Sequence, residues 1–167
     1  MNSTLKYIAG KYNFDLESSS PISLDDTRNG LAILFKELGY KVGAEIGVDR
    51  GLYSETLSKA NPGVRLYCID PWKVYKEYDD IPDQHTLNVN YNSTIKCLAP
   101  YNCKIIRKFS MGALNDFEDG SLDLPYDKIY GLEHLAIKIL KKVKSSKRAY
   151  EKEVVYLINS FQILTII

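Results

Sequence analysis

The sequence predicts an α/β fold in which a mostly parallel, doubly wound sheet carries helices on both faces. Short apolar runs without polar alternation, such as 41–48 and 64–69, are typical of strands buried on both faces. Segments with helical spacing of apolar residues, such as 25–38 and 84–99, lie between the apolar runs. Because strands and helices alternate along the chain without an internal repeat, we expect a Rossmann-like sheet of about five strands.

Apolar stripes and turn residues mark the expected helices. These helices cover 25–38, 51–60, 84–99, 111–117 and 131–144. In the first helix, four apolar residues recur at i, i+3, i+4 and i+7, and Gly39 follows as a left-handed cap residue. In the second helix Leu52 and Leu57 are expected to face inward. In the third, Ile95 belongs to the expected apolar stripe, and Pro100 ends the helix.

The strands and the domain boundary follow from the remaining segments. The expected strands cover 41–48, 64–69, 103–109, 122–130 and 153–167, the last as one strand or as two short ones. Residues 1–22 are polar and end in a Ser-Ser-Ser-Pro run, which predicts a poorly packed N-terminal arm. The remaining residues, 23–167, are then expected to form a single domain.

Composition limits the classes of partner and of location. A chain of 167 residues suits one domain, and its net charge of +1 gives no electrostatic case for nucleic acid or membrane as the main partner. The start of the chain lacks the apolar core of a signal peptide, and the apolar run 154–167 is too short to span a bilayer. We therefore expect a cytoplasmic protein. Three cysteines without a CxxC pair predict no disulfide framework and no metal site.

The turn after the first strand carries the chemical signal. The strand ends in Glu45-x-Gly47-x-x-x-Gly51 and passes directly into a helix, so its glycines allow a sharp bend and a close approach of a ligand. Asp70 ends the next strand, about 20 residues after Gly51, where an acid accepts hydrogen bonds from ribose hydroxyls. Together these features predict an adenosine-type cofactor.

The charges beside the turn indicate which cofactor. A turn that binds a pyrophosphate usually reads G-x-G-x-x-G, but here Asp49 replaces the middle glycine and Glu45 precedes the turn. Two carboxylates would repel a pyrophosphate, and they suit a sulfonium with an α-ammonium group. The pattern therefore favours S-adenosylmethionine over NAD. Asp49 is also a candidate N-cap of the following helix.

Four segments in order carry a family resemblance. Residues 42–55 read VGAEIGVDRGLYSE and residues 66–72 read LYCIDPW, followed by CKIIRKFS at 103–110 and FEDGSLD at 117–123. This series resembles the class I S-adenosylmethionine-dependent methyltransferases, and in particular the small "methyltransferase domain 24" type, over about residues 28–123. The resemblance implies S-adenosylmethionine as the cofactor and methyl transfer to a small-molecule acceptor, at oxygen or nitrogen.

The resemblance also implies roles for individual residues. The implied cofactor-binding residues are Glu45, Gly47, Val48, Asp49, Gly51, Tyr53, Asp70, Pro71, Trp72, Ser110 and Met111. The two glycines would line the methionine portion, with Glu45 near its ammonium group, and Asp70 would hold the ribose hydroxyls. Pro71 and Trp72 would border the adenine, with Ser110 and Met111 on its other side.

Two of these roles have a structural alternative. Trp72 would border the adenine or would be a core or lid aromatic. Tyr53 and Ser54 would touch the carboxylate end of the cofactor or would be residues of the helix surface.

The C-terminal third departs from the family pattern. The family continues with an apolar strand that ends in an aspartate, with a histidine a few residues later. Here Asp127 lies too early for that acid and Glu133 too late, and His134 is either a base or a solvated residue at the start of a helix.

Residues 131–167 are either a divergent or a truncated end of the family pattern, and they leave too little chain for the family's further strands. We therefore expect a sheet that is incomplete relative to the seven-stranded methyltransferase fold, and the catalytic residue stays unassigned. One alternative function is a binding or interaction remnant without turnover. A weaker alternative is an NAD-type oxidoreductase or epimerase domain.

Overall fold

Seven strands and five α-helices are described in the computed structural model. The described residues are 3–15, 22–23, 26–75, 82–127, 155–159 and 162–166. The strands are β1 (Ile22–Ser23), β2 (Val42–Ile46), β3 (Arg65–Ile69), β4 (Cys103–Ile106), β5 (Leu124–Asp127), β6 (Val155–Asn159) and β7 (Gln162–Ile166). The helices are α1 (Ser3–Tyr12), α2 (Arg28–Glu37), α3 (Leu52–Ala60), α4 (Gln84–Leu98) and α5 (Ser110–Ala113), which runs into the short 3₁₀ helix η1 (Leu114–Asp116).

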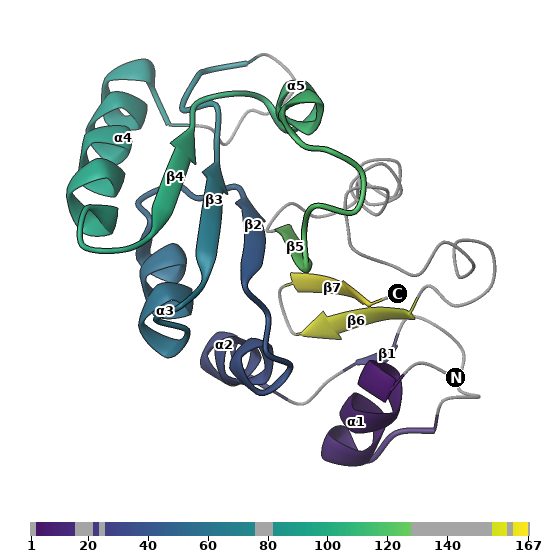
Figure 1. Cartoon of the computed structure of the whole chain (residues 1–167). Helices are drawn as coiled ribbons and strands as arrows, with labels where there is room; N and C mark the ends of the chain where they lie inside the picture. Colours follow the sequence, from purple (N-terminus) through teal and green to yellow (C-terminus); the bar gives the residue numbers. More distant parts are fainter. Residues whose placement is uncertain are drawn as a thin grey trace.

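The strands form one sheet in the order β1-β6-β7-β5-β2-β3-β4 (Figure 1). Strands β5, β2, β3 and β4 are mutually parallel, and β7 is antiparallel to both of its neighbours. This arrangement confirms the predicted Rossmann-like, mostly parallel sheet. The sheet has seven strands rather than about five, because the two-residue β1 was not expected and because residues 153–167 contribute two strands, the alternative left open above.

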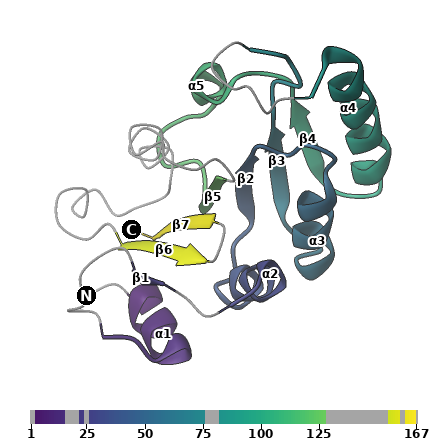
Figure 2. The same ribbon diagram turned by 180° about the vertical axis from the view of Figure 1, so that it is seen from behind.

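A hydrophobic core lies on each face of the central strands. The ribbon shows α3 and α4 on one side of these strands and α5 on the other (Figures 1 and 2). Side chains alternate along β3, so Leu66 and Cys68 join one core while Ile69 joins the other. The first core is covered by α2, α3 and α4, and the second by α5 and the segment that follows it. Helices therefore cover both faces, as the apolar strands predicted.

The N-terminal arm is more ordered than expected. Residues 3–12 form α1, and its Ile8 is fully buried in the core beneath α2. Polar contacts fix the helix, since Tyr7 Oη and Lys11 Nζ both donate to Glu37 Oε2. The prediction of a poorly packed arm was wrong for this segment, because the polar composition obscured a short stripe formed by Ile8 and Tyr12, one helical turn apart.

Two residues that were expected to face the core, Leu52 and Ile95, are exposed in the structure. Leu52 is 58% exposed and Ile95 is 42% exposed. In α3 the buried face runs through Tyr53 and Leu57, four residues apart, which turns Leu52 outward. In α4 the buried face includes Thr94, which places its neighbour Ile95 toward solvent.

The helix expected at 131–144 and the end of the strand expected at 122–130 lie outside the described residues. Within the described residues that strand covers Leu124–Asp127 only. Gly39 follows α2 with a φ of +71°, which confirms the predicted left-handed residue.

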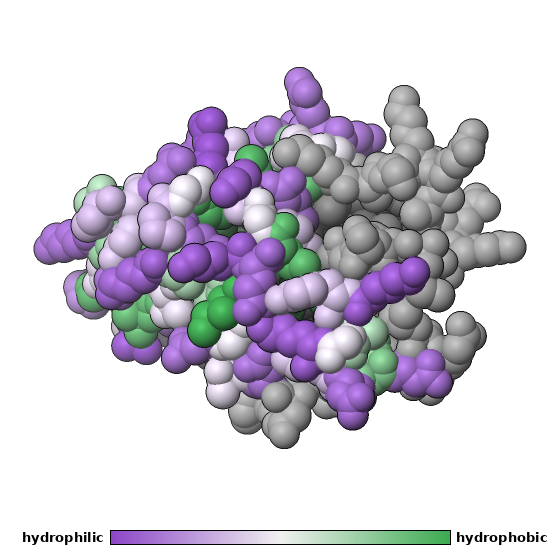
Figure 3. All heavy atoms as spheres, turned by 60° about the horizontal axis from the view of Figure 1, so that its bottom comes forward, coloured by the Kyte–Doolittle hydropathy of each residue, from purple (hydrophilic) through white to green (hydrophobic). Residues whose placement is uncertain are grey.

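The described surface is mainly hydrophilic at the end that carries α1 and α2 (Figure 3). Apolar side chains there are scattered, which is ordinary for a globular surface. Among the helices that the structure describes, none combines the length and apolarity needed to cross a membrane.

Helices α3 and α4 approach closely at Gly51. This residue is the N-cap of α3, with a φ of +79°. A Cβ atom there would lie 3.2 Å from Thr94 Cγ2 and 3.4 Å from Leu98 Cγ. Gly51 is thus required both by its backbone conformation and by the contact between the two helices.

We expect Ile8→Ala to lower the free energy of unfolding by about 2–5 kcal/mol, because it empties a fully buried site. Ile33→Ala is the matched control, since Ile33 is 49% exposed on α2, and it should change stability by less than about 0.5 kcal/mol. Urea unfolding of both variants measures the difference. Equal effects would show that α1 does not pack as described.

We expect Gly51→Ala to destabilise the protein by roughly 1–2 kcal/mol, because an alanine at positive φ is strained and its Cβ meets α4. Gly112→Ala in α5 is the control, since a Cβ there meets open space. Thermal unfolding should separate the two variants, and a Gly51→Ala protein as stable as wild type would contradict the close packing.

Candidate functional site

The carboxyl ends of the central strands meet at one edge of the sheet. Ile46 of β2 pairs with Ile69 of β3, which pairs with Ile106 of β4. The residues that follow these three are therefore neighbours at the edge where α/β folds bind ligands. Backbone hydrogen bonds continue past the strands, because the Gly47 N–H donates to the Ile69 carbonyl at 2.9 Å.

The turn between β2 and α3 has three residues with positive φ. Gly47 and Gly51 both have a φ of +79°, and Asp49 has a φ of +57°. Glycines adopt this region without strain, whereas an aspartate needs surrounding contacts to stay there. The sharp bend predicted from the two glycines is thus present, with a third, less favourable residue between them.

The Asp70 carboxylate connects two of the loops at this edge. Its Oδ2 accepts the Asp49 N–H at 3.0 Å, and its Oδ1 accepts the Trp72 N–H at 2.8 Å. Hydrogen bonds to an ionised carboxylate are stronger than neutral ones, so Asp70 fixes both its own loop and the turn after β2.

The Asp49 side chain does not cap α3. The N-cap residue is Gly51, which has no side-chain cap bond, so the capping role considered for Asp49 was wrong. Instead, Asp49 Oδ1 accepts from Asn90 Nδ2 of α4 at 2.7 Å. Arg50 Nε lies 3.5 Å from Asp49 Oδ2 on the exposed side. The left-handed conformation of Asp49 removes its side chain from the geometry that an N-cap requires.

Glu45 is a buried acid directly before the turn. It is 1% exposed and accepts from the Ser54 hydroxyl of α3. Burying a carboxylate costs free energy unless the carboxylate is hydrogen-bonded. Ser54 supplies such a bond to Glu45, and it is buried rather than lying on the helix surface. Tyr53 is also buried, and its Oη donates to the Arg28 carbonyl at 3.1 Å. Both residues were candidates for ligand contact, and both have partners within the protein.

The Trp72 side chain lies in the core. It is 1% exposed, its ring centroid lies 4.9 Å from that of Tyr91, and its Nε1 donates to the Asp49 carbonyl at 2.7 Å. Of the two roles left open above, this geometry favours the core aromatic. Val48, another candidate residue, is also buried, at 3% exposed.

Arg107, the residue after β4, was not expected at the site. Its guanidinium donates to the Trp72 carbonyl at 3.0 Å, the Asn88 side chain at 2.8 Å and the Pro71 carbonyl at 3.4 Å. It also lies 4.6 Å from the centre of the Tyr91 ring. The sequence does contain a signal for this role. Arg107 is a basic residue directly after β4, and the last residue of β4 pairs with the last residue of β3, so Arg107 lies at the same edge as the loop that follows β3.

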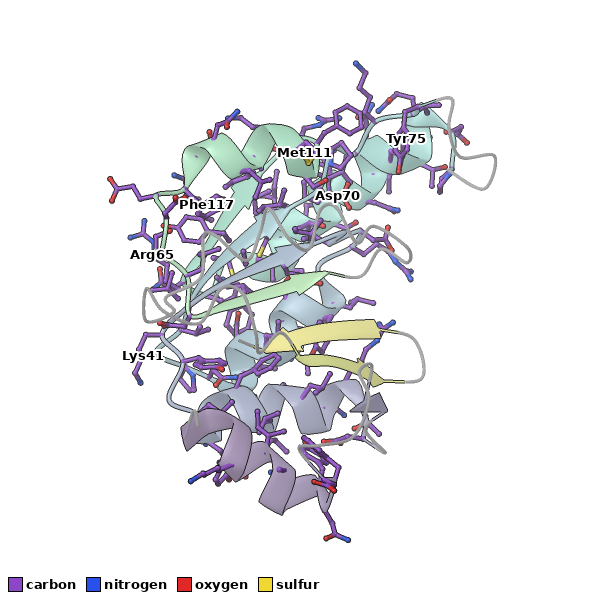
Figure 4. All side chains as sticks on the ribbon, turned by 90° about the vertical axis from the view of Figure 1, so that its right-hand side faces the viewer. Lys41, Arg65, Asp70, Tyr75, Met111 and Phe117 are labelled. Carbon is purple, nitrogen blue, oxygen red and sulfur yellow. The ribbon has the colours of Figure 1, made fainter. Side chains whose placement is uncertain are left out.

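Ser110 and Met111 begin α5 beside this edge, and Met111 is 46% exposed. Figure 4 labels Asp70, Tyr75 and Met111, which come from the segments after β3 and β4. The Tyr75 ring meets the ring of Phe109 edge-on at a centroid distance of 5.5 Å. Apolar side chains therefore lie on the side of the edge where the family resemblance implies the adenine.

Asp127 lies beside the end of β2. It is the last residue of β5 and pairs with Ile46, one position before Gly47. Whether Asp127 takes the place of the family's strand-end acid stays a prediction, since the residues that follow it lie outside the described part of the chain. Glu133 and His134 lie outside the described residues.

Two further observations concern other possible sites among the described residues. An apolar recess lined by Phe35, Leu57 and Leu66 lies between α2, α3 and the sheet, toward the amino ends of the strands. In the part of the chain that the structure describes, no group of three or more histidine, cysteine, aspartate or glutamate residues could hold a metal ion.

Several solved structures similar to this chain are methyltransferases. The O-methyltransferase TomG from Streptomyces achromogenes, in complex with SAM, matches 94% of this chain at 16% identity and a TM-score of 0.57. An O-methyltransferase from Bacillus cereus, in complex with SAH, matches 95% at 13% identity and a TM-score of 0.54. Methyltransferase PaMTH1 from Podospora anserina, bound to SAH, matches 94% at 13% identity and a TM-score of 0.53.

The matched region spans 65%, 66% and 62% of these three chains, respectively. No family model matches the sequence, and no curated protein matches it. At these identities the likeness establishes the fold. The chain has the class I S-adenosylmethionine-dependent methyltransferase fold that its motifs predicted.

Proposed function

We propose that this chain binds S-adenosylmethionine at the carboxyl edge of β2 and β3 and transfers its methyl group to a small acceptor at oxygen or nitrogen. The observation that carries the proposal is the Asp70 carboxylate, which joins the Gly47–Gly51 turn to the end of the neighbouring strand. The similar solved structures that hold SAM or SAH have the same fold and support the choice of cofactor.

The charges at the edge fit this cofactor. Glu45 is buried directly before the turn, Asp49 lies within it, and Asp70 follows the next strand. An α-ammonium and a sulfonium are cations, so neighbouring carboxylates stabilise them, whereas a pyrophosphate would be repelled. Asp70 would also accept from the ribose hydroxyls, because each oxygen of a carboxylate can accept more than one hydrogen bond.

The remaining contacts fit an adenosine whose base lies over the segments after β3 and β4. Pro71 follows Asp70 directly, and Ser110 and Met111 begin α5 on the opposite side. Trp72 would support the site without touching the adenine, since its indole lies in the core and donates a hydrogen bond to the Asp49 carbonyl of the turn. Gly51 packs against α4, so Gly47 is the glycine of the turn that we assign to close ligand approach.

The cofactor supplies a methyl carbon activated by a sulfonium. In the proposed reaction the acceptor oxygen or nitrogen forms a bond to that carbon as the carbon–sulfur bond breaks, and the bonding electrons return to sulfur. A proton of the acceptor leaves to a base. The chain's contribution would be mainly to hold the two reactants in line, which lowers the barrier by positioning.

Two other functions would leave different traces. A remnant that has lost the acceptor half would bind S-adenosylmethionine without turning over any acceptor. An NAD-type domain would bind NAD tightly, and Asp49→Gly would leave that binding unaffected. The acids beside the turn disfavour the NAD-type function.

We expect Asp70→Ala to weaken binding of S-adenosylhomocysteine by about 1–3 kcal/mol, or roughly 5- to 150-fold, because ribose hydroxyls lose their acceptor and the turn loses its anchor. Asp116→Ala is the control, since Asp116 is an acid whose contact with Lys108 lies on the surface of η1. Its affinity should equal that of wild type.

Titration calorimetry measures both affinities, and an assay for S-adenosylhomocysteine formation with candidate acceptors measures turnover. Unchanged affinity in Asp70→Ala would remove Asp70 from the site. No binding by the wild-type chain would refute both the enzyme and the remnant, and binding without turnover on any acceptor would favour the remnant.

A further inference from the structure

Asp49 is held in a conformation that an aspartate does not favour by itself. Its φ of +57° lies in the left-handed region, where the side chain of an L-residue is crowded against its own backbone. Such strain persists only where neighbouring groups hold the residue. The contacts that hold Asp49 therefore determine the shape of the proposed cofactor turn.

Hydrogen bonds reach Asp49 from two directions. From the loop after β3, Asp70 accepts its N–H, and Trp72 Nε1 donates to its carbonyl at 2.7 Å. From α4, the Thr94 hydroxyl donates to the same carbonyl at 2.8 Å, and Asn90 Nδ2 donates to Oδ1 at 2.7 Å. The backbone and the side chain of one residue are thus fixed together.

Thr94 contacts the turn at two points. Its hydroxyl has one proton, which is shared between the Asp49 carbonyl at 2.8 Å and the Asn90 carbonyl at 3.0 Å. Its methyl group faces Gly51, where a Cβ would lie 3.2 Å away. The Thr94 side chain is fully buried, so no solvent replaces its hydrogen bond if the hydroxyl is removed.

Asn90 and Thr94 lie one helical turn apart on α4, on the side that faces the turn after β2. Neither was singled out from the sequence, because their partner lies more than 40 residues earlier in the chain. Helix α4 is therefore a part of the scaffold that meets the turn directly, through polar groups as well as apolar packing.

We propose that Asn90 and Thr94 are positioning residues for the cofactor turn, which they hold in the left-handed conformation at Asp49 before any ligand arrives. This inference rests on the proposed function. A turn that is already ordered loses less conformational entropy on binding, so removing these donors should weaken the affinity for the cofactor.

Thr94→Val tests the hydroxyl alone, because valine has nearly the same shape and keeps a methyl group against Gly51. We expect Thr94→Val to weaken S-adenosylhomocysteine binding by about 2- to 10-fold, the range of one net hydrogen bond. Thr94→Ser restores the hydroxyl and should restore most of the affinity. Thr56→Val is the matched control, since the Thr56 hydroxyl donates to the Leu52 carbonyl on the exposed side of α3, and its affinity should match wild type.

Asn90 is tested through its partner. Asn90→Ala should weaken binding in the wild-type background, and it should have no further effect in an Asp49→Ala background, because the contact is then already lost. All affinities are measured by titration calorimetry on the full chain, well below the midpoint of thermal unfolding, so that stability and affinity are recorded separately.

The outcomes separate the two proposals. If Thr94→Val lowers the midpoint of unfolding but binds with wild-type affinity, the role of Thr94 is only structural and the inference is overturned, while the proposed function stands. Equal losses in Thr94→Ser and Thr94→Val would also overturn it, because the hydroxyl would not be the cause. If the wild-type chain does not bind S-adenosylhomocysteine at all, the proposed function fails and the inference fails with it.

Discussion

The pair of hydrogen bonds from backbone N–H groups to Asp70 is the constraint on which the rest of the site depends. One carboxylate at the end of β3 holds the turn after β2 and the start of its own loop. Parallel pairing of β2 with β3 places these segments side by side, and the carboxylate then fixes their conformations. Both Asp49 and Trp72 have a positive φ, and both donate their backbone N–H to Asp70. Without Asp70, the two residues would lose this shared partner.

Buried polar groups around this bridge have hydrogen-bond partners within the protein. These contacts hold the buried side of the edge in one conformation. Ser54 donates to the buried Glu45, and the Trp72 indole and the Thr94 hydroxyl share the Asp49 carbonyl. A buried polar group without a partner would be costly, so each contact restricts the alternatives open to its neighbours. Met111 of α5, by contrast, is 46% exposed, and an exposed apolar side chain suits a ligand-binding surface better than a core.

The sequence predicted the parts of the site that depend on strand order and local turn chemistry. Alternating strands and helices are enough to bring the Gly47–Gly51 turn beside Asp70, because the ends of parallel strands meet at one edge. The roles of Ser54 and Trp72 could not be resolved in this way, since their burial depends on tertiary contacts with β2 and α4. The same holds for Asn90 and Thr94, whose partner Asp49 lies more than 40 residues earlier in the chain.

The most direct test of the proposed site is amide hydrogen exchange of the full chain with and without saturating S-adenosylhomocysteine. We expect the ligand to slow exchange in residues 47–54 and 69–75, which form and flank the bridge made by Asp70, because binding stabilises the turn and its neighbouring loop. The recess near Leu57 and Leu66, at the amino ends of the strands, should show no comparable change. Protection confined to that recess, or no protection in either loop under saturating ligand, would contradict the assignment of the cofactor site to this edge.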